Sequence, residues 1–275
     1  MTSFIICSID AAKFRLISLA IAQRMAGLPH EIVGIHDARS MCEGYNRGIA
    51  RATGENLVFC HDDIDLLSPD FSRRLAIGLE QYDLIGVAGT DRLIAASWAS
   101  AGPPHIFGQV AHYHADPGHY LVDQYGIPRR IIPNIQAMDG LFIAARRHVL
   151  EKMRFDEDTF RDWHFYDLDF TFRAYLGGFH LAICCDIPLM HASIGKFTAQ
   201  WQANAALFLK KHRANLGIGT MRQFNPTTIG AADKAEALAL MTPWWWDSPT
   251  QHGGGGGGGA AAPSAAAAAR TETKT

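Results

Sequence analysis

The chain has 275 residues, 48% of them hydrophobic, which suffices for a packed core and excludes a wholly disordered protein. Its 25 basic and 27 acidic residues give a formal net charge of −2 at pH 7, so we expect no nucleic-acid partner. No apolar run reaches the ~18 residues of a transmembrane segment, the N-terminus lacks a signal-peptide pattern, and the five cysteines lack CxxC spacing. We therefore expect a cytoplasmic protein without a transmembrane segment and with reduced, buried thiols.

Short apolar runs alternate with helical periodicity over the first 90 residues. The pattern predicts strands at 4–9, 31–36, 56–60 and 84–88, and helices at 13–25, 42–52 and 69–80. We expect Ser68 to cap the third helix and Pro69 to occupy its first position. This alternation predicts an α/β fold with a mostly parallel central sheet and helices on both faces. Ligands of such sheets bind beyond the carboxyl ends of the strands.

The later sequence is less regular. Residues 90–133 predict a strand-and-loop insertion near the site, followed by strands at 141–145 and 179–185 and helices at 147–153, 167–177 and 198–216. We predict three parts: a main domain over 1–217, a C-terminal extension over 218–251, and a disordered Gly/Ala-rich tail over 252–275. The extension contains three tryptophans at 244–246, which we expect to pack on the domain or to form an oligomer contact.

The strongest polar cluster follows the third predicted strand, where His61, Asp62 and Asp63 are consecutive. Neighbouring carboxylates repel one another unless they are solvated or neutralised. They suit a divalent cation with oxygen ligands, such as Mg²⁺ or Mn²⁺. A solvated turn that caps the next helix explains the same cluster equally well.

Three later segments carry further candidates. Asp167 lies in the first turn of a predicted helix, where an acid complements the helix dipole, but it could also point into a cleft as a general base. His191 follows a strand and could be a metal ligand, and Lys196 could approach a phosphate. Asp139 and Gly140 form an acidic turn before a strand.

Several common site types have no support in the sequence. It contains no Walker loop, GxGxxG fingerprint or GxSxG elbow, which argues against the P-loop, dinucleotide-binding and α/β-hydrolase classes. The histidines at 105, 112, 114 and 119 lack a cysteine or HExxH framework, which disfavours a zinc site.

Taken in order, these segments resemble glycosyltransferase family 2, with the GT-A fold, and in particular its bacterial glycosyltransferase-like or StrF-like subgroup. The resemblance covers residues 3–215, and its matching segments are 40–55, 57–63, 86–89, 139–140, 155–156 and 166–169, with Arg173, Gly177, His191 and Gly195. It implies a Rossmann-like three-layer sandwich and an inverting transferase. Such an enzyme moves a sugar from a nucleoside-diphosphate donor to a hydroxyl of a glycan or small-molecule acceptor, here in bacterial surface glycan or glycoconjugate synthesis.

The resemblance also implies how the donor is bound. Asp37 would contact the nucleotide base, and Asp62 would contact the ribose or the metal. Asp139 and Gly140 would line the sugar, and Lys196 could assist at the diphosphate.

For the chemistry, the resemblance implies that Asp63 and His191 hold Mn²⁺ or Mg²⁺ and that Asp167 is the base. The sequence departs from the family pattern at two positions. The first acid of the usual DxD motif is replaced near His61, and Tyr166 replaces the Glu of the usual Glu-Asp pair.

Two other functions remain open from the sequence. The two departures are compatible with a non-catalytic GT-A-like module that binds a sugar nucleotide or a partner. A sugar-phosphate nucleotidyltransferase would usually carry a glycine-rich, basic loop after the first strand, whereas residues 8–13 read Ser-Ile-Asp-Ala-Ala-Lys. A homo-oligomer is compatible with either function.

Overall fold

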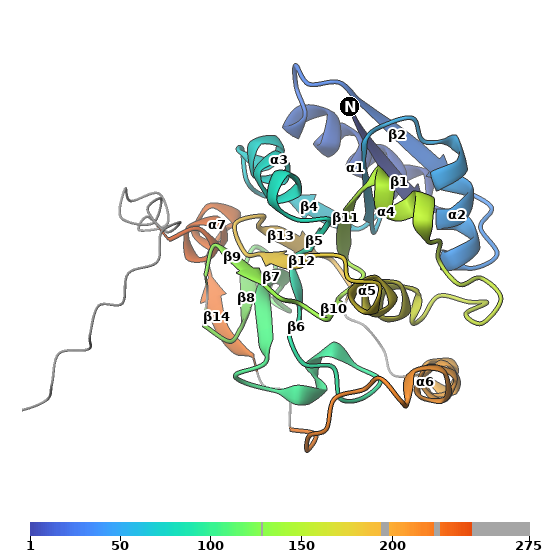
Figure 1. Cartoon of the computed structure of the whole chain (residues 1–275). Coiled ribbons are helices and arrows are strands. Elements are labelled where there is room, and N and C mark those ends of the chain that lie inside the picture. The colour runs from blue at the N-terminus through green and yellow to red at the C-terminus, as the bar shows by residue number, and fades with distance from the viewer. Residues whose placement is uncertain (128, 194–197, 223–225, 244–275) are drawn as a thin grey trace, which may run out of the picture. The chain divides into compact units, whose positions relative to one another are not determined.

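The first strand, β1 (Thr2–Cys7), pairs in parallel with β2 (His30–Ile35) and with β3 (Asn56–Cys60). Figure 1 presents the computed structural model, which describes residues 1–127, 129–193, 198–222 and 226–243. The larger sheet has the order β2-β1-β3-β11-β5-β12-β9. Its remaining strands are β11 (Phe142–Arg146), β5 (Leu84–Gly86), β12 (Leu181–Cys184) and β9 (Ile131–Pro133).

The α/β class is confirmed, but the sheet is mixed rather than mostly parallel. The pairs β1–β2, β1–β3 and β5–β12 are parallel, whereas β3–β11, β5–β11 and β9–β12 are antiparallel. Two of the antiparallel pairs involve β11, which the chain reaches from the long insertion rather than through a crossover helix. It enters between β3 and β5 in the opposite direction.

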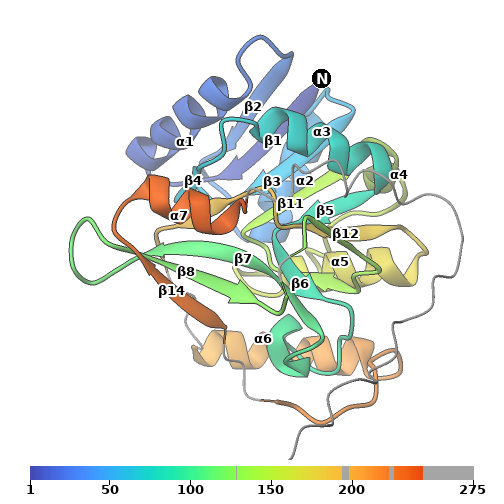
Figure 2. The same cartoon turned by 90° about the vertical axis from the view of Figure 1, so that its left-hand side faces the viewer.

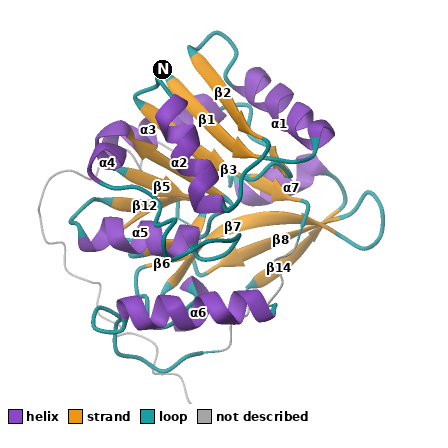
Figure 3. Cartoon of the chain, turned by 90° about the vertical axis from the view of Figure 1, so that its right-hand side faces the viewer, coloured by secondary structure: helices purple, strands orange, loops and turns teal. Residues whose placement is uncertain are grey.

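Helices cover both faces of this sheet because alternate strand residues point to opposite sides. Phe4 packs with Phe71 of α3 (Phe71–Gln81) on one face. Figure 2 shows α1 (Ala11–Arg24) on the same face of the sheet as α3. On the other face, Ile5 lies against Gly48 of α2 (Met41–Arg51). Figure 3 shows α2 on this face beside α5 (Tyr166–Leu176), and Tyr45 packs against Tyr166 there.

Helix boundaries lie within a few residues of those predicted, and their caps explain the differences. Asp10 caps α1 by accepting hydrogen bonds from the N–H groups of Ala12 and Lys13. The expectation for α3 is wrong, because that helix begins at Phe71 and its N-cap residue is Asp70. Two further helices are α4 (Arg147–Lys152) and α6 (Ala199–His212).

A second sheet, with the order β10-β6-β7-β13-β4, takes its longest strand, β7, from the insertion. Its strands are β10 (Ala137–Met138), β6 (Ala88–Thr90), β7 (Ile106–Tyr113), β13 (Leu189–His191) and β4 (Ile64–Leu66). β8 (Tyr120–Tyr125) pairs with β7, and a short 3₁₀ helix, η1, spans Trp98–Ala101. The predicted strand-and-loop insertion is therefore confirmed.

Two elements follow the predicted boundary at residue 217. β14 (Thr227–Ala231) pairs with β8, and α7 (Lys234–Met241) packs on both strands (Figure 2). Ala231, Ala237 and Met241 share a buried cluster with Val122 and Met190. Residues Met1–Pro243 thus make one compact unit, and the proposed division into domain and extension stays a prediction. The tryptophans at 244–246 and the tail over 252–275 lie outside the described residues.

Candidate functional site

A pocket of about 620 Å³ opens where η1, the second sheet and the start of α5 meet. Its polar lining comes from His61, His112, Asp123, Asp139, Asp167 and His191. Its aromatic lining comes from Trp98, Tyr113, Tyr125, Trp163, Phe165, Tyr166 and Trp201. A few polar groups converging in a mainly apolar pocket are typical of a small-molecule site.

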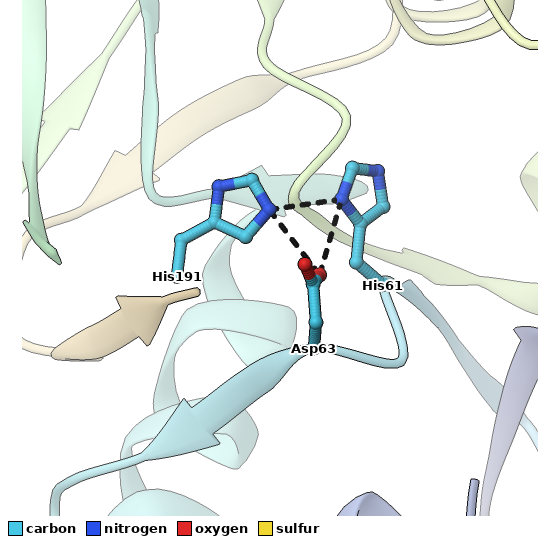
Figure 4. A group of neighbouring side chains, drawn as sticks. All are labelled: His61, Asp63 and His191. Atoms are coloured by element: carbon cyan, nitrogen blue, oxygen red, sulfur yellow. Dashed lines mark hydrogen bonds and ion pairs between the residues drawn. The ribbon is translucent and has the colours of Figure 1, made fainter. Parts of the chain in front are cut away.

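His61 and His191 of the pocket face each other and the side chain of Asp63, as Figure 4 shows. Nδ1 of His61 lies 3.3 Å from Nε2 of His191, and Oδ1 of Asp63 lies 3.3 Å from the same Nε2. The remaining separation, from Nδ1 of His61 to Oδ1 of Asp63, is 4.0 Å. Of the described His, Cys, Asp and Glu residues, this is the one group of three that could hold a metal ion.

Three strand ends place these ligands. β3 ends at Cys60, directly before His61, and β4 begins directly after Asp63. β13 pairs with β4 and ends at His191, whose Cα partner is Ile64. The pairing of two short strands therefore brings His191 next to Asp63, although 127 positions of sequence separate Ile64 from His191.

The protonation states of this group suit a cation. Burial raises the pKa of Asp63, but hydrogen bonds from His191 and Ser193 outweigh it and hold the pKa well below its usual range. Burial and the neighbouring His191 lower the pKa of His61. An ionised carboxylate and a neutral imidazole are the forms in which these side chains bind metals.

His61 also contacts the residue at the second departure from the family pattern. Its Nε2 lies 2.8 Å from the hydroxyl of Tyr166, which donates a hydrogen bond to the carbonyl oxygen of Gly140 at 3.2 Å. Gly140 fits here because it has no side chain, since a Cβ would collide with the Tyr166 hydroxyl. The two replaced positions are thus direct partners in the fold.

Asp167 also contacts Gly140, on the same side as Tyr166. Its Oδ2 accepts a hydrogen bond from the Gly140 N–H at 2.8 Å. Burial and the nearby charge of Asp139 raise the pKa of Asp167 to about 7. Asp139 is itself fixed, since it accepts hydrogen bonds from Leu141 N–H at 2.9 Å and from the Trp98 indole at 3.0 Å. A carboxyl with a pKa near 7 can act as a general base at neutral pH.

The backbone before Asp167 is strained. Phe165 has φ 66°, a left-handed conformation that a bulky residue rarely adopts. Its ring is held by Phe160 and, from α6, by Trp201 and Phe208, with ring centroids 5.3–6.2 Å apart. This packing offsets the cost of the conformation and directs the first turn of α5 into the pocket.

The model of a glycosyltransferase-like family matches residues 3–212. The chain belongs to this family. The predicted resemblance to glycosyltransferase family 2 is therefore confirmed, and no match was found among curated proteins.

Three solved structures are similar to this chain. The chain is similar to the mannosyltransferase PcManGT from Pyrobaculum calidifontis, solved with GDP-Man and Mn²⁺, at 14% identity and a TM-score of 0.48 over 87% of this chain and 68% of that one. It is similar to S. aureus TarS at 14% identity and a TM-score of 0.42, over 78% and 72% of the two chains. Drosophila β1,4-galactosyltransferase 7 is similar at 12% identity and a TM-score of 0.43, over 74% and 78%. The family assignment rests on the sequence match alone.

The residues expected to bind the donor in this glycosyltransferase-like chain lie in different surroundings. Asp62 accepts a hydrogen bond from the hydroxyl of Ser8 at 2.6 Å, at the carboxyl end of β1. Asp37 is exposed and pairs with Arg47 at 2.6 Å. Neither lines the pocket that the described residues form, and Lys196 lies outside the described residues.

Two alternative sites are not supported in this glycosyltransferase-like chain. The turn after β1 has Asp10 as its helix cap, so an acid rather than a phosphate satisfies the first N–H groups of α1. Among the histidines of the insertion, His105 pairs with Asp91 at 2.9 Å and His112 lies near Asp123 at 3.7 Å. The described residues of the insertion do not form a group of three metal ligands.

The sequence did not identify His61 as a member of the group with Asp63 and His191, or Tyr166 as its partner. A signal for His61 was present, because an imidazole stands at the start of the segment that resembles the DxD motif. No sequence signal links Tyr166 to His61, since 105 positions separate them. Finally, no helix of the described residues is long and apolar enough to cross a membrane.

Proposed function

We propose that this chain transfers a sugar from a nucleoside-diphosphate sugar to an acceptor hydroxyl, with inversion at the anomeric carbon. The observation that carries the proposal is the position of Asp167. This half-buried carboxyl, with its pKa raised to about 7, lines the same pocket as His61 and His191. A base and a group of cation ligands at one pocket are what such a transfer requires.

In the proposed reaction, the Asp167 carboxylate takes the proton of the acceptor hydroxyl while the hydroxyl oxygen attacks the anomeric carbon. The new carbon–oxygen bond forms as the bond from that carbon to the diphosphate breaks, and its electron pair leaves with the nucleoside diphosphate. A single base suffices because no glycosyl-enzyme intermediate is formed. General base catalysis of this kind contributes ~10²–10⁴-fold to the rate.

Asp63 and His191 are the residues that we propose to hold Mn²⁺ or Mg²⁺. Their facing atoms are 3.3 Å apart, and the lowered pKa of Asp63 keeps its carboxylate ionised, so both fit a cation. When bound, the cation supplies positive charge that stabilises the leaving diphosphate. The family alone supports no choice between the two metals.

The donor and acceptor would occupy different parts of the site. Asp139 and Gly140 would line the sugar, with Asp139 oriented by the Trp98 indole. Asp62 and Asp37, at the carboxyl ends of the first strands, would contact ribose and base, and Lys196 the diphosphate. Aromatic rings of the pocket, such as Trp163, suit the apolar faces of a glycan or small-molecule acceptor. Bacterial surface glycan synthesis in the cytoplasm, by a monomer or homo-oligomer, remains part of this proposal.

The first experiment is thermal unfolding with UDP-, GDP- and dTDP-sugars, each with and without Mn²⁺. We expect one nucleotide sugar to raise the melting temperature only with the metal. Asp167→Asn should keep this stabilisation and lose transfer, and NMR of the wild-type product should show inversion. Sugar transfer by the Asp167→Asn variant would show that Asp167 is not the base. Absence of binding by any donor, with acceptors present, would favour a non-catalytic module.

A further inference from the structure

The group of His61, Asp63 and His191 is sized for one cation. Its three facing atoms form a triangle with sides of 3.3, 3.3 and 4.0 Å, whose circumradius is about 2.1 Å. One point therefore lies at about 2.1 Å from all three atoms, which is the length of a bond from a transition-metal ion to imidazole nitrogen or carboxylate oxygen.

The hydroxyl of Tyr166 contacts both Nε2 of His61 and the carbonyl oxygen of Gly140. The single hydroxyl proton of Tyr166 is donated to the buried carbonyl oxygen of Gly140. The Nε2 of His61, 2.8 Å from the same hydroxyl, then carries the hydrogen and donates it to the Tyr166 oxygen. A neutral imidazole has one N–H, so the lone pair is left on Nδ1, the atom that faces Asp63 and His191.

We propose that His61 is a third ligand of the cation, with Tyr166 as the positioning residue that fixes its tautomer. The set then has two imidazoles and one carboxylate, and it selects a transition-metal dication such as Co²⁺ or Zn²⁺ over Mg²⁺. Mg²⁺ prefers oxygen ligands, whereas imidazole nitrogen favours the later transition metals. The two departures from the family pattern therefore belong together. His61 places an imidazole where the family has an acid, and its hydrogen-bond partner, Tyr166, replaces a second acid. This inference rests on the proposed function only in taking the cation as part of the donor site.

The test measures metal binding by the metal-free protein, with no nucleotide sugar present. Calorimetry gives its affinities for Co²⁺ and Mg²⁺, and pulsed EPR counts the nitrogen ligands of bound Mn²⁺. We expect two nitrogen ligands in the wild type and one in His61→Asp, with a fall of at least ~10-fold in the Co²⁺/Mg²⁺ affinity ratio. The matched control is His148→Gln, which removes an imidazole bonded to Asp83 outside the group and should change neither measurement.

Tyr166→Phe keeps the aromatic ring and removes the hydroxyl. It should weaken Co²⁺ binding ~10-fold in the wild-type background and leave metal affinity unchanged in the His61→Asp background. A merely structural role of Tyr166 would weaken binding equally in both. Circular dichroism checks that each variant is folded.

One nitrogen ligand in the wild type, an unchanged affinity ratio in His61→Asp, or no Co²⁺ binding at millimolar concentration would overturn the inference. The proposed transfer is judged separately, by donor binding and product formation. A protein with two nitrogen ligands that binds no nucleotide sugar would retain the metal site and lose the proposed function. A protein that forms the product but has only one nitrogen ligand would retain the proposed function and lose the inference about the metal site.

Discussion

Gly140 and Asp167 are joined by a hydrogen bond of 2.8 Å from the glycine N–H to the carboxylate. A Cβ built on Gly140 would lie 2.8 Å from the Cβ of Asp167 and still closer to the hydroxyl of Tyr166. The turn and the first residues of α5 therefore fit together only if position 140 has no side chain. This contact sets the distance between the candidate base and the group that positions His61.

Gly140→Ala is expected to disturb both partners. The added methyl must push Tyr166 and Asp167 away, which costs about 1–3 kcal/mol as overpacking of a well-filled site. Urea unfolding measures this loss, and metal affinity should fall with it because Tyr166 moves. A matched control is Gly230→Ala in β14, where a Cβ would meet no atom within 4 Å. An unaltered stability of Gly140→Ala would contradict the close contact.

The pH dependence of transfer should follow Asp167. Since the base acts as a carboxylate and its pKa is raised to about 7, kcat/KM should rise with pH and level off above that value. Asp139→Asn removes the like charge that helps to raise the pKa, so the rising limb should move to lower pH. Asp123→Asn, a change of another pocket carboxyl, should leave the position of the limb unaltered.

The raised pKa of Asp167 also makes the free energy of unfolding depend on pH. The folded chain holds a proton on Asp167 up to about pH 7, whereas the unfolded chain releases it near pH 4. This group therefore lowers the free energy of unfolding as the pH rises between these values. Asp167→Asn should become more stable relative to the wild type over that range, as measured by urea unfolding at several pH values. A constant difference would contradict the raised pKa.

Asp169 behaves in the opposite way, because it is a buried ion-pair centre. It accepts hydrogen bonds from Arg173 at 2.7 Å and from His212 at 2.7 Å, and pairs with Lys211 at 2.6 Å. Burial opposes its ionisation, but these partners hold the pKa of Asp169 below its usual value. Its contribution to stability is thus present above about pH 4 and is lost as the pH falls further.

Asp169→Asn should lower the free energy of unfolding by about 3–5 kcal/mol, as expected when one partner of a buried pair is removed. Asp70→Asn is the control, because the Asp70 carboxylate is exposed, lies 3.3 Å from Arg73 and 3.8 Å from Arg74, and should contribute less than about 1 kcal/mol. Denaturant titrations at neutral pH compare the two. Equal losses would show that burial does not distinguish the pairs.

Removal of the chain after residue 217 should destabilise the protein, because β14 and α7 would go. Val122, Met190 and their neighbours would lose their cover, at about 1.5–3 kcal/mol for each large apolar side chain exposed, and β8 would become an open edge. The melting temperature and solubility of the shortened chain test this. Removal of 252–275 alone, a segment of low complexity, should change neither. A stable chain ending at 217 would support the predicted division into domain and extension.

Much of the fold could be predicted because local patterns are strong in the first half. The strand at 56–60 was predicted with its observed bounds, and the helices there were located to within about two residues. β4 and β13 were missed, since strands of three residues carry too little pattern. The direction of β11 depends on how the insertion returns the chain to the sheet, which periodicity does not record.

Site residues that belong to family motifs could be predicted from the sequence. Contacts that form only when distant segments come together in the fold could not. Asp63, His191 and Asp167 stay candidates, since the structure supplies distances and no test of their roles. The link from His61 through Tyr166 to Gly140 depends on three segments far apart in the sequence. The raised pKa of Asp167 depends on burial and on Asp139, neither of which a motif contains.

Phe165, with its left-handed backbone, links the candidate base Asp167 to α6, a helix that begins more than thirty residues later in the chain. Its ring is held by Trp201 and Phe208 of α6, so a change in that aromatic contact alters the backbone two residues before Asp167. Sequence changes within α6 can therefore alter the pKa of Asp167 and the orientation of its carboxyl group. Two relatives with identical groups around their substrates need not share a pH optimum.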